Sequence, residues 1–203
     1  MSRYKRPLSL PLLSLFFFIF ASVQQIGLLP AAAAGRERIK NVSVEIIEEQ
    51  IAVSAELVSG FNSDIVRDIQ NGIPKDFYYY LLLKRKQKNW FDEELLSKTI
   101  RYTVKYDTLK KQYRVTQIEG EKTTESVFDD FEGMKQKVSR VERVKIAPLQ
   151  ALKSRYRYYV SVKSQMKAAK LPFYGDYLLF FIPFLELDTP WSDSDVISFQ
   201  RAS

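Results

Sequence analysis

The chain has 203 residues and a net charge of +7 at neutral pH, from 31 Lys and Arg against 24 Asp and Glu. It contains neither His nor Cys, which excludes Ser-His-Asp and Cys-His catalysis, disulfides, zinc sites built from thiolates or imidazoles, and iron–sulfur clusters. A hydrophobic fraction of 46% and a charged fraction of 27% are typical of a folded chain, and the length suits one domain.

Residues 1–34 have the order of a secretory signal peptide. Basic side chains come first, an apolar run follows over residues 8–20, and a stretch of small residues ends at Ala34. We therefore expect an exported, periplasmic protein in which residues 35–203 form a single antiparallel β-rich domain. Residues 8–29 are also long enough to span a bilayer, so an uncleaved inner-membrane anchor is the alternative.

The domain is predicted to begin with an antiparallel hairpin. Apolar residues alternate with polar ones over residues 42–46 and again over residues 51–58. A period of two means that one face of each strand is buried. The polar residues 48–50 between the two strands fit a short turn.

A short helix is expected over residues 61–72. Ser63 can cap its N-terminus, and Gly72 suits the position that follows its last turn. Ile65 and Ile69 are one turn apart, so they should share the buried face of the helix.

Residues 77–83 are an unbroken apolar and aromatic run, which predicts a long central strand. Basic residues follow at once, so the end of this strand should emerge into solvent. Trp90 and Phe91 are expected to turn the chain. Residues 101–118 then show the clearest hairpin pattern of the sequence, with a lysine-rich turn between the two strands.

A second helix is predicted over residues 127–141, because apolar side chains recur there at spacings of four and three. Its apolar stripe should pack into the core. Residues 144–146 are expected to continue as a short strand or loop. Tyr and Val alternate with basic and polar residues over residues 155–163, which predicts another strand.

An apolar run over residues 177–185 dominates the C-terminal tail. It is too short to span a bilayer, so we expect it to pack on the core or to cover a sheet edge. The alternative is an exposed patch that lies on a membrane or on a partner. The candidate residues for such a patch are Phe180, Phe181, Phe184 and Trp191.

These elements predict a β-rich fold, between all-β and α+β: a single antiparallel sandwich-like or curved-sheet domain with two short helices. The strands do not alternate regularly with long helices, which argues against a parallel α/β fold. The sequence contains no glycine-rich phosphate-binding loop of a known pattern.

The chain also contains a series of short motifs in a fixed order. They are Asn-Gly-Ile-Pro at 71–74, the aromatic and basic strand at 78–85, Trp-Phe-Asp at 90–92, an Arg-Tyr…Tyr-Asp…Tyr hairpin at 101–113, Leu-Pro at 171–172 and Thr-Pro-Trp at 189–191. This order resembles the bacterial domain-of-unknown-function family numbered 4390. The resemblance implies no catalytic residue, because the family has no established activity. Members are often encoded beside membrane sensor kinases, which implies an accessory role in envelope signalling.

Two basic segments are candidate contacts for an anionic partner. Aromatic residues accompany both segments, as they do in nucleic-acid sites, but an exported chain is not expected to meet nucleic acid. The ordinary interpretation is a solvated strand end protected by its charges. The functional alternative is an anionic envelope partner: lipid headgroups, an acidic glycan or an acidic protein face. The candidate residues are Lys84, Arg85, Lys86, Lys88, Arg155 and Arg157.

Two groups of adjacent carboxylates are candidates for general acid–base catalysis: residues 92–94 and residues 129–130. Adjacent side chains on a strand point to opposite faces, which argues against catalysis. Residues 193–195 have the spacing of two calcium ligands but lack the glycine and distal glutamate of a full loop. We therefore expect no metal, no cofactor and no small-molecule substrate.

The sequence leads to three hypotheses. The first is a non-enzymatic, exported interaction module that binds an envelope protein or a membrane surface. The second is a module that binds anionic lipid or another polyanion through the basic strand ends. The third is a hydrolase that works with carboxylates alone.

Overall fold

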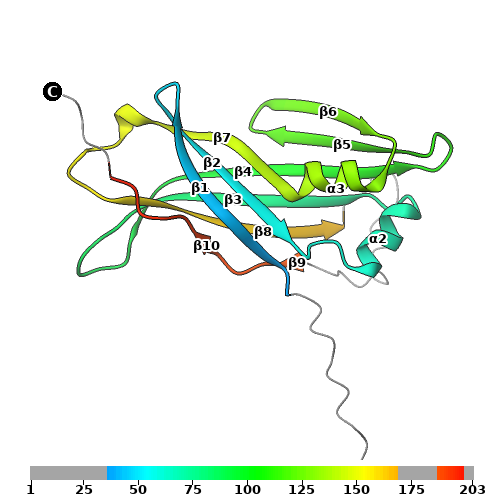
Figure 1. Cartoon of the computed structure of the whole chain (residues 1–203), viewed down its shortest axis with the longest axis horizontal. Helices are drawn as coiled ribbons and strands as arrows, with labels where there is room; N and C mark the ends of the chain where they lie inside the picture. The colour runs from blue at the N-terminus through cyan, green and yellow to red at the C-terminus, as the bar shows by residue number, and fades with distance from the viewer. Residues whose placement is uncertain (1–35, 169–186, 199–203) are drawn as a thin grey trace, which may run out of the picture. The chain divides into compact units, whose positions relative to one another are not determined.

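The computed structural model describes residues 36–168 and 187–198, which form two antiparallel β-sheets with two α-helices packed on them (Figure 1). This arrangement confirms the predicted β-rich fold with two short helices. The elements in chain order are β1 (Arg38–Ile47), β2 (Gln50–Val58), α2 (Ser63–Gln70), β3 (Lys75–Arg85), β4 (Glu93–Asp107), β5 (Gln112–Glu119), β6 (Lys122–Phe128), α3 (Phe131–Ser139), β7 (Arg140–Pro148), the 3-10 turn η1 (Leu149–Ala151), β8 (Tyr158–Ala168), β9 (Leu187–Asp188) and β10 (Ser192–Asp193).

The larger sheet has β3 near its centre. Its strand order is β10-β8-β3-β4-β5-β6, and β9 also pairs with β8. Along its whole length, β3 pairs with β4 on one side and with β8 on the other. The smaller sheet, β1-β2-β7, crosses one face of the larger sheet (Figure 1), and buried side chains from both form one hydrophobic core. Neither sheet is closed, so the architecture is sandwich-like.

Strand β3 shows how the alternation of the sequence builds this core. Phe77, Tyr79, Leu81 and Leu83 are fully buried, whereas the side chains between them are partly exposed. The hydroxyl of Tyr79 donates a hydrogen bond to the carbonyl of Val138 at 2.6 Å. Burial raises the pKa of Tyr79, so its hydroxyl stays protonated inside the core.

Both predicted hairpins are confirmed. Strands β1 and β2 pair across a two-residue turn in which Glu48 and Glu49 have φ values of 48° and 57°. Positive φ at both central residues is the geometry of the type I′ turn, whose twist matches that of the flanking strands. Strands β4 and β5 form the second hairpin.

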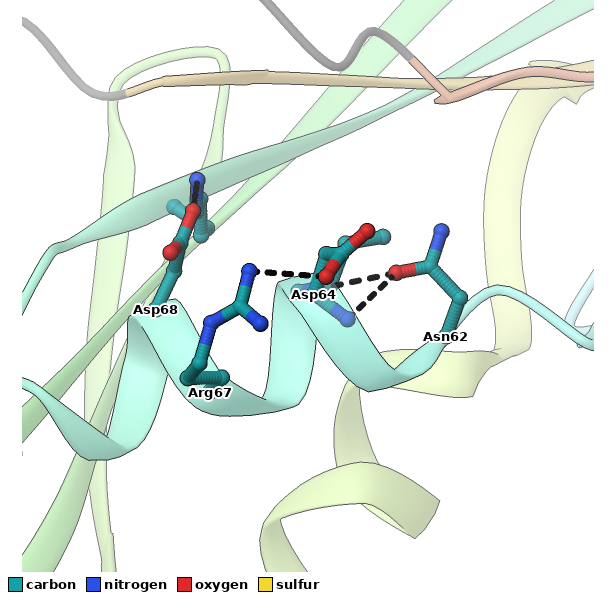
Figure 2. A network of polar contacts seen from close by, with 6 residues as sticks. Asn62, Asp64, Arg67 and Asp68 are labelled. Carbon is teal, nitrogen blue, oxygen red and sulfur yellow. Dashed lines mark hydrogen bonds and ion pairs between the residues drawn. The ribbon is translucent and has the colours of Figure 1, made fainter. Parts of the chain in front are cut away.

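Helix α2 lies where the sequence predicts it, but its N-cap is Asn62 and the expectation of Ser63 was wrong. The side-chain oxygen of Asn62 accepts hydrogen bonds from the backbone N–H groups of Asp64 and Ile65 at 3.1 and 3.0 Å (Figure 2). The chain enters the helix one residue earlier than expected, so Ser63 is already its first helical residue. Gly72 has φ +82° directly after the C-cap, as predicted.

The second helix is shorter than predicted. The expected span of 127–141 divides into the end of β6, helix α3 and the start of β7. Val127 is exposed on an edge strand and Val141 is buried on β7, so only the middle of the apolar pattern is helical. The helix begins at the point where the side chain of Asp130 accepts a hydrogen bond from the N–H of Gly133 at 2.7 Å. Strand β6 was missed because its apolar residues fit a helical period.

Two strand boundaries also differ from the predictions. Strand β4 begins at Glu93, opposite Arg85, and not within the expected hairpin at 101–118. Strand β8 begins at Tyr158, so Arg155 and Arg157 of the predicted strand at 155–163 lie in the turn that precedes it. Across 36–168 and 187–198, no helix combines the length and the apolar character needed to cross a membrane.

Candidate functional site

The two predicted basic segments meet at one end of the larger sheet. Arg85 at the end of β3 pairs with Tyr158 at the start of β8. The N–H of Lys86 donates a hydrogen bond to the carbonyl of Arg157 at 2.9 Å. This end includes the green loop between β3 and β4 at the lower left of Figure 1. We call it the basic tip, and define it as Lys84, Arg85, Lys86, Lys88, Trp90, Phe91, Arg155, Tyr156 and Arg157.

Two aromatic side chains stand in solvent at the basic tip. Trp90 is 82% exposed and Phe91 is 96% exposed, both in the loop of residues 86–92. Trp90 accompanies the first basic segment in the sequence, whereas Phe91 was expected only to turn the chain. The available signal was an adjacent Trp-Phe pair between two charged segments. The two rings are neighbours in the chain and form an exposed aromatic pair beside the cations of the basic tip.

Of the four residues proposed as an apolar patch, only Trp191 is described. It is 44% exposed, and the ammonium of Lys84 lies 5.7 Å from the centroid of its ring. Trp191 therefore lies beside the basic tip. Phe180, Phe181 and Phe184 lie outside the described residues.

Only one cation of the basic tip, Arg85, forms an ion pair with a described residue. Arg85 forms an ion pair with Glu93, and its guanidinium lies 4.4 Å from the ring centroid of Tyr156. Arg85 therefore holds the two strands and the following turn together. The remaining cations form no ion pair with any residue in the described ranges, so their charge is available to an anionic partner: Lys84, Lys86, Lys88, Arg155 and Arg157.

Asp92 fixes the base of the loop. Its carboxylate accepts hydrogen bonds from the N–H of Gln87 at 2.8 Å and from the hydroxyl of Tyr159 at 2.7 Å. These two bonds, with the nearby cations of Lys86 and Lys84, lower the pKa of Asp92. The carboxylate thus closes the loop at both ends and ties it to β8.

Comparison with known proteins agrees with the resemblance seen in the sequence. The model of the family described as a domain of unknown function (DUF4390) matches residues 34–195. The chain belongs to this family. No curated protein and no solved structure matches it.

Apart from the exposed Glu94, the remaining carboxylates considered for hydrolysis have structural partners in this DUF4390 domain. Glu93 pairs with Arg85, and Asp129 accepts a hydrogen bond from the side-chain amide of Gln112 at 2.9 Å. Asp130 caps α3. No group of three or more acidic side chains that could hold a metal ion occurs among the residues that the structure describes.

Acid should loosen the base of the loop in this DUF4390 domain. The pKa of Asp92 lies below its ordinary value of 3.8, so its stabilising contribution is present above that pH and is lost as the pH falls through the lowered pKa. We expect the protection of the Gln87 amide against hydrogen exchange, measured by NMR, to fall over that interval. In Tyr159→Phe the pKa of Asp92 should rise, and the loss should begin at higher pH.

Tyr80→Phe is the matched control, because Tyr80 lies on β3 and makes no side-chain hydrogen bond to a described residue. It should leave the pH profile of Gln87 unchanged. Identical profiles for the wild type and Tyr159→Phe would show that the bond to Asp92 does not hold the loop.

Proposed function

We propose that this DUF4390 protein is an exported, non-enzymatic binding module that docks on an anionic membrane surface through its basic tip. The observation that carries the proposal is the exposed pair Trp90 and Phe91 beside unpaired Lys and Arg side chains. Trp at a membrane settles at the level of the headgroups, and Phe enters the acyl boundary. Cations beside them are attracted by anionic lipid, each contributing about 1 kcal/mol.

Neither kind of contact suffices alone. Burial of one large apolar side chain contributes about 1.5–3 kcal/mol at most, and a charge-only contact is screened by salt within about 8 Å at physiological ionic strength. Stable attachment to a membrane usually needs two such signals together. The basic tip provides both on one short loop and its neighbouring turn.

Other features support a binding role over catalysis. The sequence lacks His and Cys, and three of the carboxylates considered for catalysis serve a cap, an ion pair and the base of the loop. The exposed rings belong to a loop tip, which suits insertion into a surface. The family context of sensor kinases would give a membrane-docked module an accessory role in envelope signalling.

Vesicle binding tests the proposal. The wild type should co-sediment with vesicles of phosphatidylglycerol and phosphatidylcholine, and not with phosphatidylcholine alone. The double variant W90S/F91S should bind the anionic vesicles about thirty-fold more weakly, the equivalent of about 2 kcal/mol of lost ring insertion. Leu109→Ser is the matched control, because Leu109 is 94% exposed at the β4–β5 turn, outside the basic tip.

Fluorescence adds a readout of insertion. The chain has two Trp residues, so Trp191→Phe leaves Trp90 as the only indole. Its emission should shift to the blue when anionic vesicles are added, because the ring leaves water. All variants share the same N-terminus, so residues 1–34 contribute equally to each. Binding to soluble polyglutamate with no vesicle binding and no blue shift would favour an acidic protein partner and overturn the membrane proposal.

A further inference from the structure

A polar cavity of about 380 Å³ lies between α3, β7 and the exposed part of the larger sheet. It arises because the smaller sheet covers only part of the larger one. Its last strand, β7, contacts β4, whereas α3 packs on β5 and β6 (Figure 1). The cavity floor between them is formed by Gln117 and by Tyr102, which is itself buried; the two residues are direct partners on β5 and β4.

Gly133 shapes the wall of this cavity. A Cβ atom at this position would lie 3.2 Å from a ring carbon of Phe128, which also lines the cavity. Gly inside a helix costs about 1 kcal/mol relative to Ala. Because Gly133 has no Cβ, the first turn of α3 can lie close to β6 with the ring of Phe128 between them.

The lining is rich in hydrogen-bond donors. Lys137 and Arg140 are cationic, Gln117 and Gln136 carry amides, and Glu142 is the single carboxylate. Within the described part of the chain, the side chains of Gln117, Gln136 and Arg140 have no hydrogen bond or ion pair with another residue. Such a lining suits a small ligand that has both a carboxylate and several hydroxyl or amide groups.

Tyr102 forms part of the cavity floor and is not a catalytic base. Its hydroxyl donates a hydrogen bond to the carbonyl of Arg140 at 3.4 Å. The ammonium of Lys137 lies 5.9 Å from the centroid of its ring. Burial, followed by the charges of Glu119 and Glu142, raises the pKa of Tyr102 to about 12, so the group is neutral at physiological pH.

A second cavity of about 220 Å³ adjoins the first, and the two share Gln136 and Arg140 in their walls. Its further lining includes Glu132, Lys135 and Ser139 on α3 and Glu56, Leu57 and Val58 on β2, so it is partly polar and partly apolar. Two neighbouring cavities that share the donors Gln136 and Arg140 fit a ligand of two rings. The larger one alone falls within the range of about 300–1,000 Å³ that small-molecule sites occupy.

We infer that these two cavities bind an acidic disaccharide, with its carboxylate at Lys137 and Arg140 and its hydroxyl and amide groups at Gln117, Gln136 and Glu142. This inference departs from the sequence analysis, which predicted no small-molecule ligand. The site is formed by α3, the β4–β6 face and residues of β7 and β2, none of which belongs to the basic tip, so it does not depend on the proposed membrane docking.

The test uses two disaccharides of equal size that differ in charge: glucuronate linked to N-acetylglucosamine, and the neutral N,N′-diacetylchitobiose. In an NMR titration of the wild type, the acidic sugar should shift the side-chain amide signals of Gln117 and Gln136, and the neutral sugar should bind more weakly. The double variant K137Q/R140Q should bind the acidic sugar at least about ten-fold more weakly.

The control variant is K105Q/R114Q. Lys105 and Arg114 are cross-strand partners on β4 and β5. Each is separated by an odd number of positions from the cavity residue of its own strand, Tyr102 or Gln117. Because side chains alternate along a strand, Lys105 and Arg114 lie on the other face of the same sheet. It removes the same charge and should bind like the wild type. The assignment would be overturned if both sugars bound equally well, or if lactate bound as tightly as the acidic sugar. The absence of any amide shift in the wild type would overturn it too.

Discussion

Replacement of Lys86, Lys88, Arg155 and Arg157 together by Gln should weaken binding to anionic vesicles about a thousand-fold. Each cation close to an anionic lipid surface contributes about 1 kcal/mol, and about 1.4 kcal/mol corresponds to a factor of ten. All four side chains are exposed, and none forms an ion pair with a described residue. Their loss should therefore reduce attraction to lipid with little effect on the fold. Vesicle co-sedimentation at low salt measures the change.

The control removes the same charge elsewhere on the sheet. Lys105, Lys110, Lys111 and Lys122 are likewise exposed and have no ion pair with a described residue. They lie on β4, on the β4–β5 turn and at the start of β6, outside the basic tip. Their replacement by Gln should weaken binding far less. Equal losses in both quadruple variants would mean that net charge, and not the basic tip, attracts the vesicle.

Asp68→Ala should destabilise the fold by about 3 kcal/mol, because it leaves a buried cation without its partner. The ammonium of Lys75 lies 2.6 Å from the carboxylate of Asp68, which is labelled in Figure 2, and the Lys75 side chain is only 4% exposed. Lys75 is the first residue of β3, whereas Asp68 lies on α2. The ion pair thus fastens the helix to the central strand. Urea unfolding gives the free energy directly.

Two variants define how much of this effect is the unpaired charge. Asp64→Ala breaks the exposed pair of the same helix with Arg67 (Figure 2) and should cost less than about 1 kcal/mol. Combining Asp68→Ala with Lys75→Met removes both charges and should recover much of the lost stability. If the double variant is no more stable than Asp68→Ala, the unpaired charge of Lys75 is not the cause of the lost stability.

The strands were the most predictable part of this fold. Alternation is a local property, and in β3 the buried positions of Phe77, Tyr79, Leu81 and Leu83 follow directly from it. The region from β6 to β7 was less predictable. The apolar spacing of four and three from Val127 to Val141 fits one long helix, but it also fits a short helix flanked by two strands. Only tertiary packing decides between these two structures.

The candidate site was predictable only in its composition. The sequence identified the basic residues of both segments, because charge is visible in any sequence. It could not show that β3 and β8 pair, since their registry is fixed by contacts between residues far apart in the chain. Nor could it separate Trp90 and Phe91, which face solvent, from aromatic residues such as Phe77 that pack inside.

The bonds of Asp92 to Gln87 and Tyr159 give the loop at the basic tip a defined conformation before any partner arrives. A preorganised loop loses little conformational entropy when it docks, so more of the contact energy is retained as affinity. Association should then be limited by diffusion and electrostatic steering, with no slow ordering step. Loss of the Asp92 side chain should therefore slow association in the proposed docking, although every side chain assigned to the contact would still be present.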